Sequence, residues 1–269
     1  MNFKTGIIID SLKLPIKDGI AKAKDLGADG FQVYCVEGEM APENMQGNRL
    51  RELKDYIAKL GLEISALCGD LGKGFTDKEL NKTTVPRSKE FIDLAVRLGV
   101  KIVTTHIGKL PEDENSPVWD IAAESVIELA KYAEENGCYF ASETGPDKPA
   151  VLKKFLSRIR STGIKINYDP ANLIMAGPYD HIGGVSTLRD YIVHTHAKDG
   201  VCLWQNPEGR NKYLEVPLGE GSVAFTYYLR ALKEINYSGY LTVEREVGDN
   251  PVKDIGMAVK FLKKKISEL

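Results

Sequence analysis

Five times along the chain, a stretch with helical periodicity ends in glycine, and a short apolar run follows at once. A helix often ends beside a residue in the left-handed conformation, which glycine adopts without steric cost. A connection of only a few residues into the next strand is typical of αβ units. The glycines are Gly27, Gly61, Gly99, Gly137 and Gly163. The pattern therefore predicts a chain of alternating helices and strands.

The stretches before these glycines repeat apolar residues every three or four positions, which is the period of an amphipathic helix. Residues 16–26 and 50–60 show this period, and residues 251–265 form the last predicted helix. The apolar runs alternate little with polar residues, as expected for strands covered on both faces. The runs predict eight strands, at residues 3–9, 30–35, 63–67, 102–106, 139–143, 164–169, 192–196 and 240–244.

Strands that alternate with helices predict an α/β fold with a parallel sheet. Eight such units in 269 residues predict a closed (β/α)8 TIM barrel. An open doubly wound sheet is the alternative, disfavoured because no Gly-x-Gly-x-x-Gly motif follows the first strand. With no linker or low-complexity segment in the sequence, we expect one domain over residues 1–269. Residues 198–221 lack clear periodicity, which indicates a functional loop.

Charge and composition exclude several classes of protein. The chain has 36 Lys and Arg against 38 Asp and Glu, a net charge of −2, which disfavours a nucleic-acid binder. Its four cysteines form no Cys-x-x-Cys pair, which excludes a zinc ribbon and disfavours a disulfide framework. The first residues contain too short an apolar run for a signal peptide, and no window suits a membrane span. We therefore expect a soluble, cytoplasmic protein with no membrane partner.

Acidic groups and one histidine stand where four of the late strands end. They are Glu143, Asp169, His196 and Glu244. In a (β/α)8 barrel, the carboxyl ends of all strands meet at one rim, where active sites lie. A buried carboxylate must either become protonated or find a cation. Three carboxylates with one imidazole suit Mn²⁺, Mg²⁺ or Co²⁺ and also accept Zn²⁺. These residues therefore predict a divalent metal site.

An alternative interpretation of the same rim is an ion-pair network without a metal ion. Lys198 and Arg245 stand close in sequence to the acidic groups and would neutralise them. Such networks also gather carboxylates, so spacing alone does not decide between the two interpretations.

The late segments resemble the xylose-isomerase-like barrel superfamily of sugar-phosphate isomerases and epimerases, which includes AP endonuclease family 2. The similar motifs are Ser-Glu-Thr at 142–144, Tyr-Asp-Pro-Ala-Asn-Leu at 168–173, His-Thr-His-Ala-Lys-Asp-Gly at 194–200 and Gly-Tyr-Leu-Thr-Val-Glu-Arg-Glu at 239–246. The resemblance implies that Glu143, Asp169, His196 and Glu244 hold the metal. It further implies that Glu143 and Glu244 transfer protons as a catalytic pair.

The chain departs from the ketose 3-epimerases of this superfamily at two positions that hold the substrate in those enzymes. Asn172 stands where they carry a histidine. Gly200, Val201 and Cys202 follow Asp199 where they carry an arginine. The resemblance is therefore to the superfamily rather than to the 3-epimerases.

The resemblance and the chemistry together predict a metal-dependent isomerase or epimerase for a small sugar or sugar phosphate. A divalent ion stabilises the enediolate that forms when a proton leaves a carbon next to a carbonyl. A dehydratase or lyase acting on a keto-sugar or cyclitol is the alternative on the same metal site. An endonuclease IV-like phosphodiesterase is disfavoured by the small number of histidines, four in all. A sugar-binding barrel without catalytic activity is a further alternative. The sequence also permits a homo-oligomer.

Five further residues are predicted to contact the substrate, namely His106, Asn172, Lys198, Trp204 and Glu246. For His106 the alternatives are a second metal ion or a structural hydrogen bond. For Lys198 they are a substrate oxyanion or phosphate, or a pair with Glu143. His194 lies two residues before His196 and so points to the same side of the strand. We expect His194 to support the metal-binding glutamates from below.

Overall fold

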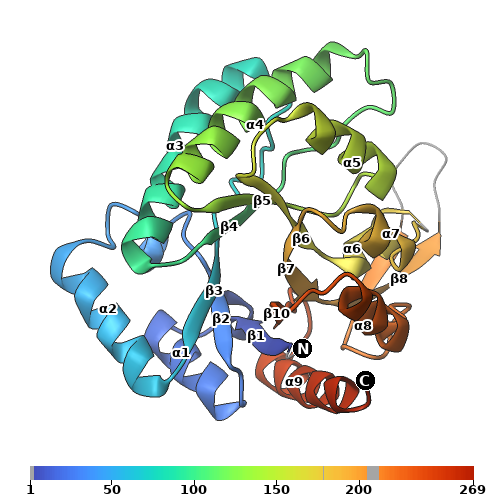
Figure 1. The fold of residues 1–269 in the computed structure, drawn as a ribbon. Helices are drawn as coiled ribbons and strands as arrows, with labels where there is room; N and C mark the ends of the chain where they lie inside the picture. The colour runs from blue at the N-terminus through green and yellow to red at the C-terminus, as the bar shows by residue number, and fades with distance from the viewer. Residues whose placement is uncertain (1–2, 178, 205–211) are drawn as a thin grey trace.

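The computed structural model describes residues 3–177, 179–204 and 212–269. Eight parallel strands close into a barrel with helices around it (Figure 1). The barrel strands are β1 (Lys4–Ile8), β2 (Gly30–Tyr34), β3 (Glu63–Cys68), β4 (Ile102–Thr105), β5 (Tyr139–Glu143), β6 (Ile164–Tyr168), β7 (Ile192–Ala197) and β10 (Tyr240–Val243). Each differs from its predicted bounds by no more than one residue at either end. The predicted TIM barrel is confirmed.

The first and last barrel strands close the sheet. β1 pairs with β10 in parallel, with Lys4 opposite Tyr240, and β1 pairs with β2 on its other side. Around the barrel the order is β1, β10, β7, β6, β5, β4, β3 and β2. The four strands that end in the predicted metal ligands, β5, β6, β7 and β10, are therefore consecutive neighbours.

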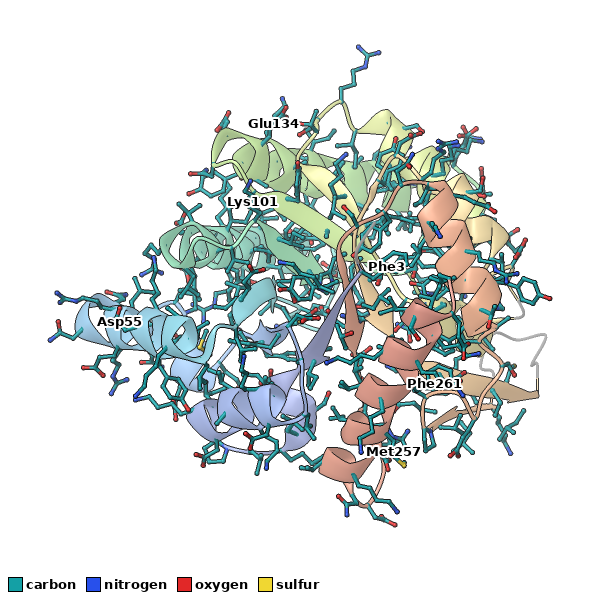
Figure 2. All side chains as sticks on the ribbon, turned by 60° about the horizontal axis from the view of Figure 1, so that its bottom comes forward. Phe3, Asp55, Lys101, Glu134, Met257 and Phe261 are labelled. Carbon is teal, nitrogen blue, oxygen red and sulfur yellow. The ribbon has the colours of Figure 1, made fainter. Side chains whose placement is uncertain are left out.

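Nine α-helices and two short 3₁₀ helices lie in the described part of the chain. The 3₁₀ helices are η1 (Ile9–Leu12) and η2 (Gly38–Met40). The α-helices are α1 (Ile16–Asp25), α2 (Gly47–Leu60), α3 (Lys78–Leu98), α4 (Pro117–Glu135), α5 (Pro149–Arg158), α6 (Pro170–Ala176), α7 (Gly183–Thr187), α8 (Phe225–Glu234) and α9 (Pro251–Ser267). Charged side chains such as Asp55 and Glu134 lie at the periphery of the molecule (Figure 2). None of these described helices combines the length and hydrophobicity that a membrane span requires.

Gly99 and Gly163, two of the glycines that end the predicted helical stretches, are required for different structural reasons. Gly99 follows α3 with φ +78°, the predicted left-handed cap. Gly163 does not have a positive φ, so its prediction as a left-handed cap was wrong. A Cβ on Gly163 would lie 2.0 Å from the backbone oxygen of Ala130 in α4. Glycine is required there because two backbones approach closely.

Residues 198–221 contain regular structure, so the prediction of an irregular loop was wrong. β8 (Asp199–Trp204) and β9 (Lys212–Val216) form a separate antiparallel pair. The Asp199 carboxylate accepts hydrogen bonds from the backbone N–H groups of Gly200, Gly219, Gly221 and Val223 at 2.9–3.0 Å. These contacts join the beginning of β8 to the segment that follows β9. They stabilise a hairpin whose sequence has no clear alternation.

Candidate metal centre

The four predicted ligands meet at one rim of the barrel. One potential ligand atom from each of Glu143, Asp169, His196 and Glu244 lies within 4.8 Å of all the others. Their side chains are 8%, 0%, 1% and 5% exposed. Ligand atoms on opposite sides of a divalent ion, each about 2.2 Å from it, lie about 4.4 Å apart. The spacing of the cluster therefore fits one ion.

Asp169 has one oxygen committed to the backbone and one directed into the cluster. It is the N-cap of α6, and its Oδ1 accepts hydrogen bonds from the N–H groups of Ala171 (2.7 Å) and Asn172 (2.9 Å). Pro170 suits the first helical position because it has no N–H to satisfy there. Asp169 Oδ2 accepts no hydrogen bond from any described residue. Burial raises the pKa of Asp169 to about 6, and a bound cation would relieve that cost.

His196 points Nδ1 at the three carboxylates. Its Nδ1 lies 3.2 Å from Glu244 Oε2, 3.4 Å from Glu143 Oε1 and 3.8 Å from Asp169 Oδ2. Burial by itself lowers the pKa of His196, but the charges of Glu143 and Glu244 raise it well above its ordinary value. Without a metal ion the imidazole is therefore protonated, and a divalent ion would replace that proton.

The other nitrogen of His196 is held by Gln32 on β2. Gln32 Oε1 lies 3.0 Å from His196 Nε2, and Gln32 Nε2 donates to Thr104 Oγ1 at 3.3 Å. Because the Gln32 amide nitrogen is used by Thr104, its oxygen faces the ring and accepts the Nε2 hydrogen. That arrangement leaves Nδ1 as the nitrogen that can hold a metal. Nothing in the sequence pattern singled out Gln32, since it lies inside an early strand.

Glu143 accepts one amide hydrogen bond on each carboxylate oxygen. Asn167 Nδ2 donates to Oε2 at 3.1 Å, and Asn172 Nδ2 donates to Oε1 at 2.8 Å. Asn167 is a fully buried residue of β6 and was not singled out from the sequence. Asn172 was predicted to contact substrate, and the structure shows that it also orients Glu143. Together the two amides fix the plane of this carboxylate.

His194 supports Glu143 indirectly, through Asn167. Its Nδ1 lies 2.9 Å from Asn167 Oδ1, and its Nε2 lies 3.0 Å from Thr242 Oγ1. Burial holds the pKa of His194 well below its ordinary value, so the ring is neutral. Nδ1–H therefore donates to Asn167, and Nε2 accepts from the threonine hydroxyl. This buried hydrogen-bonded chain lies directly beneath the cluster.

Lys198 pairs with Glu244 rather than with Glu143, so that alternative was wrong. Its Nζ lies 3.2 Å from Glu244 Oε2, 2.9 Å from Glu246 Oε2 and 3.7 Å from Glu215 Oε2. Burial by itself raises the pKa of Glu244, but the neighbouring His196 and Lys198 lower it below its usual range. Burial lowers the pKa of Lys198, but the surrounding carboxylates raise it above its ordinary value. Glu244 is therefore a carboxylate and Lys198 a cation across the neutral pH range.

The ion-pair alternative is realised only in part. Arg245 lies away from the cluster, with Nη1 2.8 Å from Glu215 Oε1 and Nε 3.0 Å from Asp254 Oδ2. Glu244 Oε2 lies 3.2 Å from both His196 Nδ1 and Lys198 Nζ, but it accepts no hydrogen bond from a described residue. Asp169 Oδ2 likewise accepts none, and its nearest cationic atom is His196 Nδ1 at 3.8 Å. A buried carboxylate oxygen without a hydrogen-bond donor can be stabilised by a bound cation. The donor set thus fits a divalent metal.

His106 directly follows β4 at the rim and pairs with Asp70, for which the sequence pattern predicted no role. Its Nδ1 lies 2.7 Å from Asp70 Oδ2, and its Nε2 lies 3.8 Å from Glu143 Oε1. Asp70 Oδ1 accepts the N–H of Gly72 at 2.9 Å, which fixes the carboxylate. Burial lowers the pKa of His106, but Glu143 and Asp70 raise it to about 9. His106 is therefore a cation at neutral pH.

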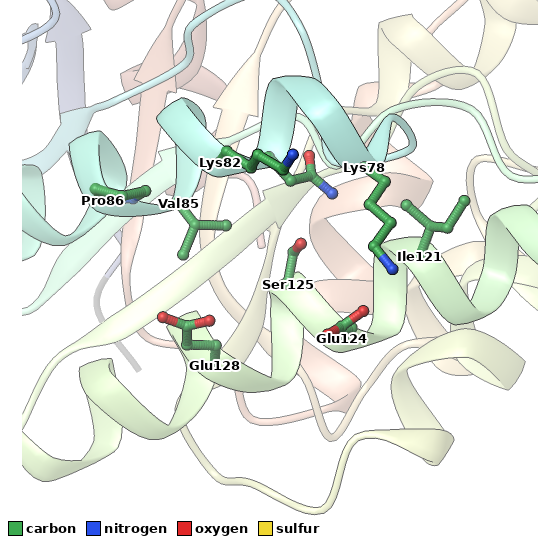
Figure 3. Close-up of a pocket in the computed structure, with 9 residues that line it drawn as sticks. Lys78, Lys82, Val85, Pro86, Ile121, Glu124, Ser125 and Glu128 are labelled. Carbon is green, nitrogen blue, oxygen red and sulfur yellow. The ribbon is translucent and has the colours of Figure 1, made fainter.

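The cluster opens into a small polar cavity of about 220 Å³, whose lining includes Tyr34, Asp70, His106, Asn172 and Lys198. Glu246 also lines it, so four of the five predicted substrate contacts reach this cavity. The fifth is Trp204, which ends β8 and whose side chain lies outside the described part of the structure. A cavity between α3 and α4 is lined by residues such as Lys78 and Glu124 and contains none of the cluster (Figure 3).

The chain is similar in sequence and in fold to several known proteins. Residues 20–265 match the family described as xylose isomerase-like TIM barrel. The chain is 25% identical over 260 residues to an uncharacterised protein of Methanocaldococcus jannaschii, covering 92% of this chain and 85% of the relative. It is 24% identical over 223 residues to a putative L-ribulose-5-phosphate 3-epimerase of Haemophilus influenzae, and the match covers 78% of this chain and 76% of the relative. The crystal structure of a xylose isomerase domain protein from Planctomyces limnophilus superposes with a TM-score of 0.84 at 26% sequence identity. The match covers 100% of this chain and 99% of that structure's chain.

Proposed function

Because the chain belongs to the xylose isomerase-like TIM barrel family, we propose that it is a divalent-metal-dependent isomerase or epimerase of a small sugar. One observation carries the proposal. Glu143 on β5 and Glu244 after β10 stand at the two ends of an arc of four neighbouring strands, with Asp169 and His196 between them. Two carboxylates thus lie on either side of one candidate metal position.

The residues that would hold the ion are Glu143, Asp169, His196 and Glu244. When bound there, a divalent ion supplies Lewis-acid stabilisation of negative charge that develops on a substrate carbonyl oxygen. Mn²⁺, Mg²⁺ and Co²⁺ suit this oxygen-rich set best. The small net charge of −2 supports a sugar rather than a nucleic acid as the substrate.

Proton transfer is assigned to the two glutamates. Glu244 is paired with Lys198 as an ionised carboxylate, and an ionised carboxylate can accept a proton from a carbon next to the carbonyl. Glu143 is held in one orientation by Asn167 and Asn172, which suits a group that must return a proton at a defined position. If one glutamate removes a proton from a carbon and the other returns a proton to the opposite face of that carbon, the reaction is an epimerisation. If one glutamate moves a proton between adjacent carbons, the reaction is an isomerisation.

Deuterium exchange tests the proposal directly. The Mn²⁺-loaded protein is incubated in D₂O with a panel of ketoses and their phosphates, and label next to the carbonyl is measured by NMR. We expect exchange with at least one sugar and its loss in Glu244→Gln. Exchange that survives in this variant would assign the base to another residue. No exchange with any member of the panel would refute the proposed reaction class.

A dehydratase is the second candidate, and the Asp70–His106 pair favours it. A cationic imidazole 3.8 Å from Glu143 is placed to protonate a hydroxyl group that leaves as water. The same incubations distinguish the two reactions, because dehydration lowers the product mass by that of one water molecule. His106→Gln would then abolish water loss but leave deuterium exchange in place.

A further inference from the structure

A second, larger cavity adjoins the metal cavity on the side of β8 and β9. It has a volume of about 480 Å³ and shares His106, Asn172, Lys198 and Glu246 with the smaller one. The two cavities therefore adjoin at these four side chains, and a molecule whose reacting carbons lie at the cluster would have the larger space beside it. A monosaccharide bound at the cluster would not need that space.

The walls of this second cavity differ in chemistry from the metal cavity. Beyond the shared polar residues, its described lining is predominantly apolar, consisting of Pro146, Met175, Ala176, Tyr213, Leu214 and Val247, together with Gly145 and Glu215. Tyr213, Leu214 and Val247 are 60%, 51% and 46% exposed. Large apolar side chains gathered around a cavity indicate a binding surface for an apolar group.

The apolar wall is held in a fixed position relative to the metal cavity. Glu215, buried on β9, accepts hydrogen bonds from Arg245 Nη1 at 2.8 Å and from the Glu246 N–H at 3.1 Å. Its other oxygen lies 3.7 Å from Lys198 Nζ. On the opposite side, a Cβ on Gly200 would lie 2.7 Å from Met175 Sδ, so β8 packs tightly on α6.

We propose that this cavity, lined by Met175, Tyr213, Leu214 and Val247, is a subsite for an apolar substituent carried by the sugar substrate. This inference rests on the proposed function and names the substrate class of the same site. A second sugar ring would need polar partners for its hydroxyl groups, and beyond the four shared residues the described lining offers only two polar side chains, the Glu215 carboxylate, which is already bonded to Arg245, and the Tyr213 hydroxyl. A phosphate would need a free cation, but among the described lining residues Lys198 is shared by Glu244, Glu246 and Glu215, and His106 is paired with Asp70.

Matched pairs of ligands test the subsite by binding alone. D-fructose and D-tagatose are compared with their mono-O-benzyl ethers, substituted at either end of the carbon chain so that the carbonyl stays free. Dissociation constants for the Mn²⁺-loaded protein are measured by NMR titration. We expect at least one ether to bind about tenfold more tightly than its parent, because the ring is removed from water.

Two exposed side chains give variants that do not disturb the core. The double variant Tyr213→Ser with Leu214→Ser is expected to abolish the benzyl preference and to leave Mn²⁺ affinity unchanged. Tyr227→Ser is the control, because Tyr227 is 63% exposed on α8 and does not line the cavity. An ether that binds no more tightly than its parent, or a preference that survives the double variant, would overturn the subsite. Absence of deuterium exchange is a separate result that bears on the reaction class.

Discussion

Asn172 Nδ2 donates a hydrogen bond to Glu143 Oε1 at 2.8 Å, from the first turn of a helix that Asp169 caps. The same short segment thus contributes one candidate ligand and orients another. Asp169 receives the Asn172 backbone N–H, while the Asn172 side chain reaches Glu143. The position where the resemblance to ketose 3-epimerases implies a histidine therefore has a role in shaping the metal centre.

Replacing Asn172 should weaken metal binding without unfolding the protein. Asn172→Ala removes the hydrogen bond to Glu143 Oε1 but keeps the backbone N–H that caps α6. We expect a loss of about tenfold in Mn²⁺ affinity, in the range found when a group orienting a metal ligand is removed. Isothermal titration calorimetry measures the change. Asn136→Ala, at the end of α4, is the control, and equal affinities in both variants would contradict the role of Asn172.

Gln32 should control which nitrogen of His196 carries the hydrogen. Gln32→Leu keeps a similar volume but removes the acceptor for His196 Nε2–H. We expect Mn²⁺ affinity to fall by about 10–100-fold. Nitrogen-15 NMR of the neutral ring at high pH would show a mixture of the two tautomers in place of one. A single unchanged tautomer would mean that another group holds the ring.

A divalent ion should stabilise the folded protein, since the native cluster brings three carboxylates together. At a free Mn²⁺ concentration of about 100 times Kd, linkage predicts about 2.7 kcal/mol of stabilisation. For a chain of this size we expect a rise in Tm of about 5–10 °C. Differential scanning calorimetry with and without EDTA measures it. Asp169→Asn should lose most of the metal-dependent rise, and a wild-type Tm indifferent to metal would argue against the site.

Asp147 should make stability depend on pH away from the metal centre. Its Oδ1 accepts the Leu110 N–H at 3.1 Å, and burial raises its pKa to about 6. The unfolded carboxyl ionises near pH 3.9. The folded state therefore favours the protonated form, and this contribution is complete below about pH 4 and lost as pH rises through about 6.

Asp147→Asn keeps an oxygen acceptor for Leu110 and stays neutral at every pH. We expect it to raise the free energy of unfolding by about 2 kcal/mol at pH 8 and by little at pH 4. Urea denaturation at the two pH values measures the difference. A variant that is less stable than the wild type at pH 8 would show that the ionised carboxylate is stabilising.

The barrel strands and the four candidate ligands were predictable from local sequence. Each strand is a short apolar run, five of the eight follow a helical pattern that ends in glycine, and this information lies within a few neighbouring residues. In a parallel barrel all strands end at one rim, so residues that follow different strands converge whatever their separation in sequence. Glu143 and Glu244 could therefore be placed together although they are 101 residues apart in the sequence.

Tertiary structure alone decided the contacts that tune the site. Gln32 and His196 are separated by 164 residues, and Asp70 and His106 by 36. Hydrogen bonds depend on tenths of an ångström and on which side chain reaches which, and no periodicity encodes either. The hairpin of β8 and β9 and the glycine at position 163 were missed for a related reason, because one depends on the Asp199 carboxylate bonding residues 219–223 and the other on the approach of α4 to Gly163. The sequence by itself determined the barrel and the residues at its rim, whereas packing determined how those residues are oriented, charged and enclosed.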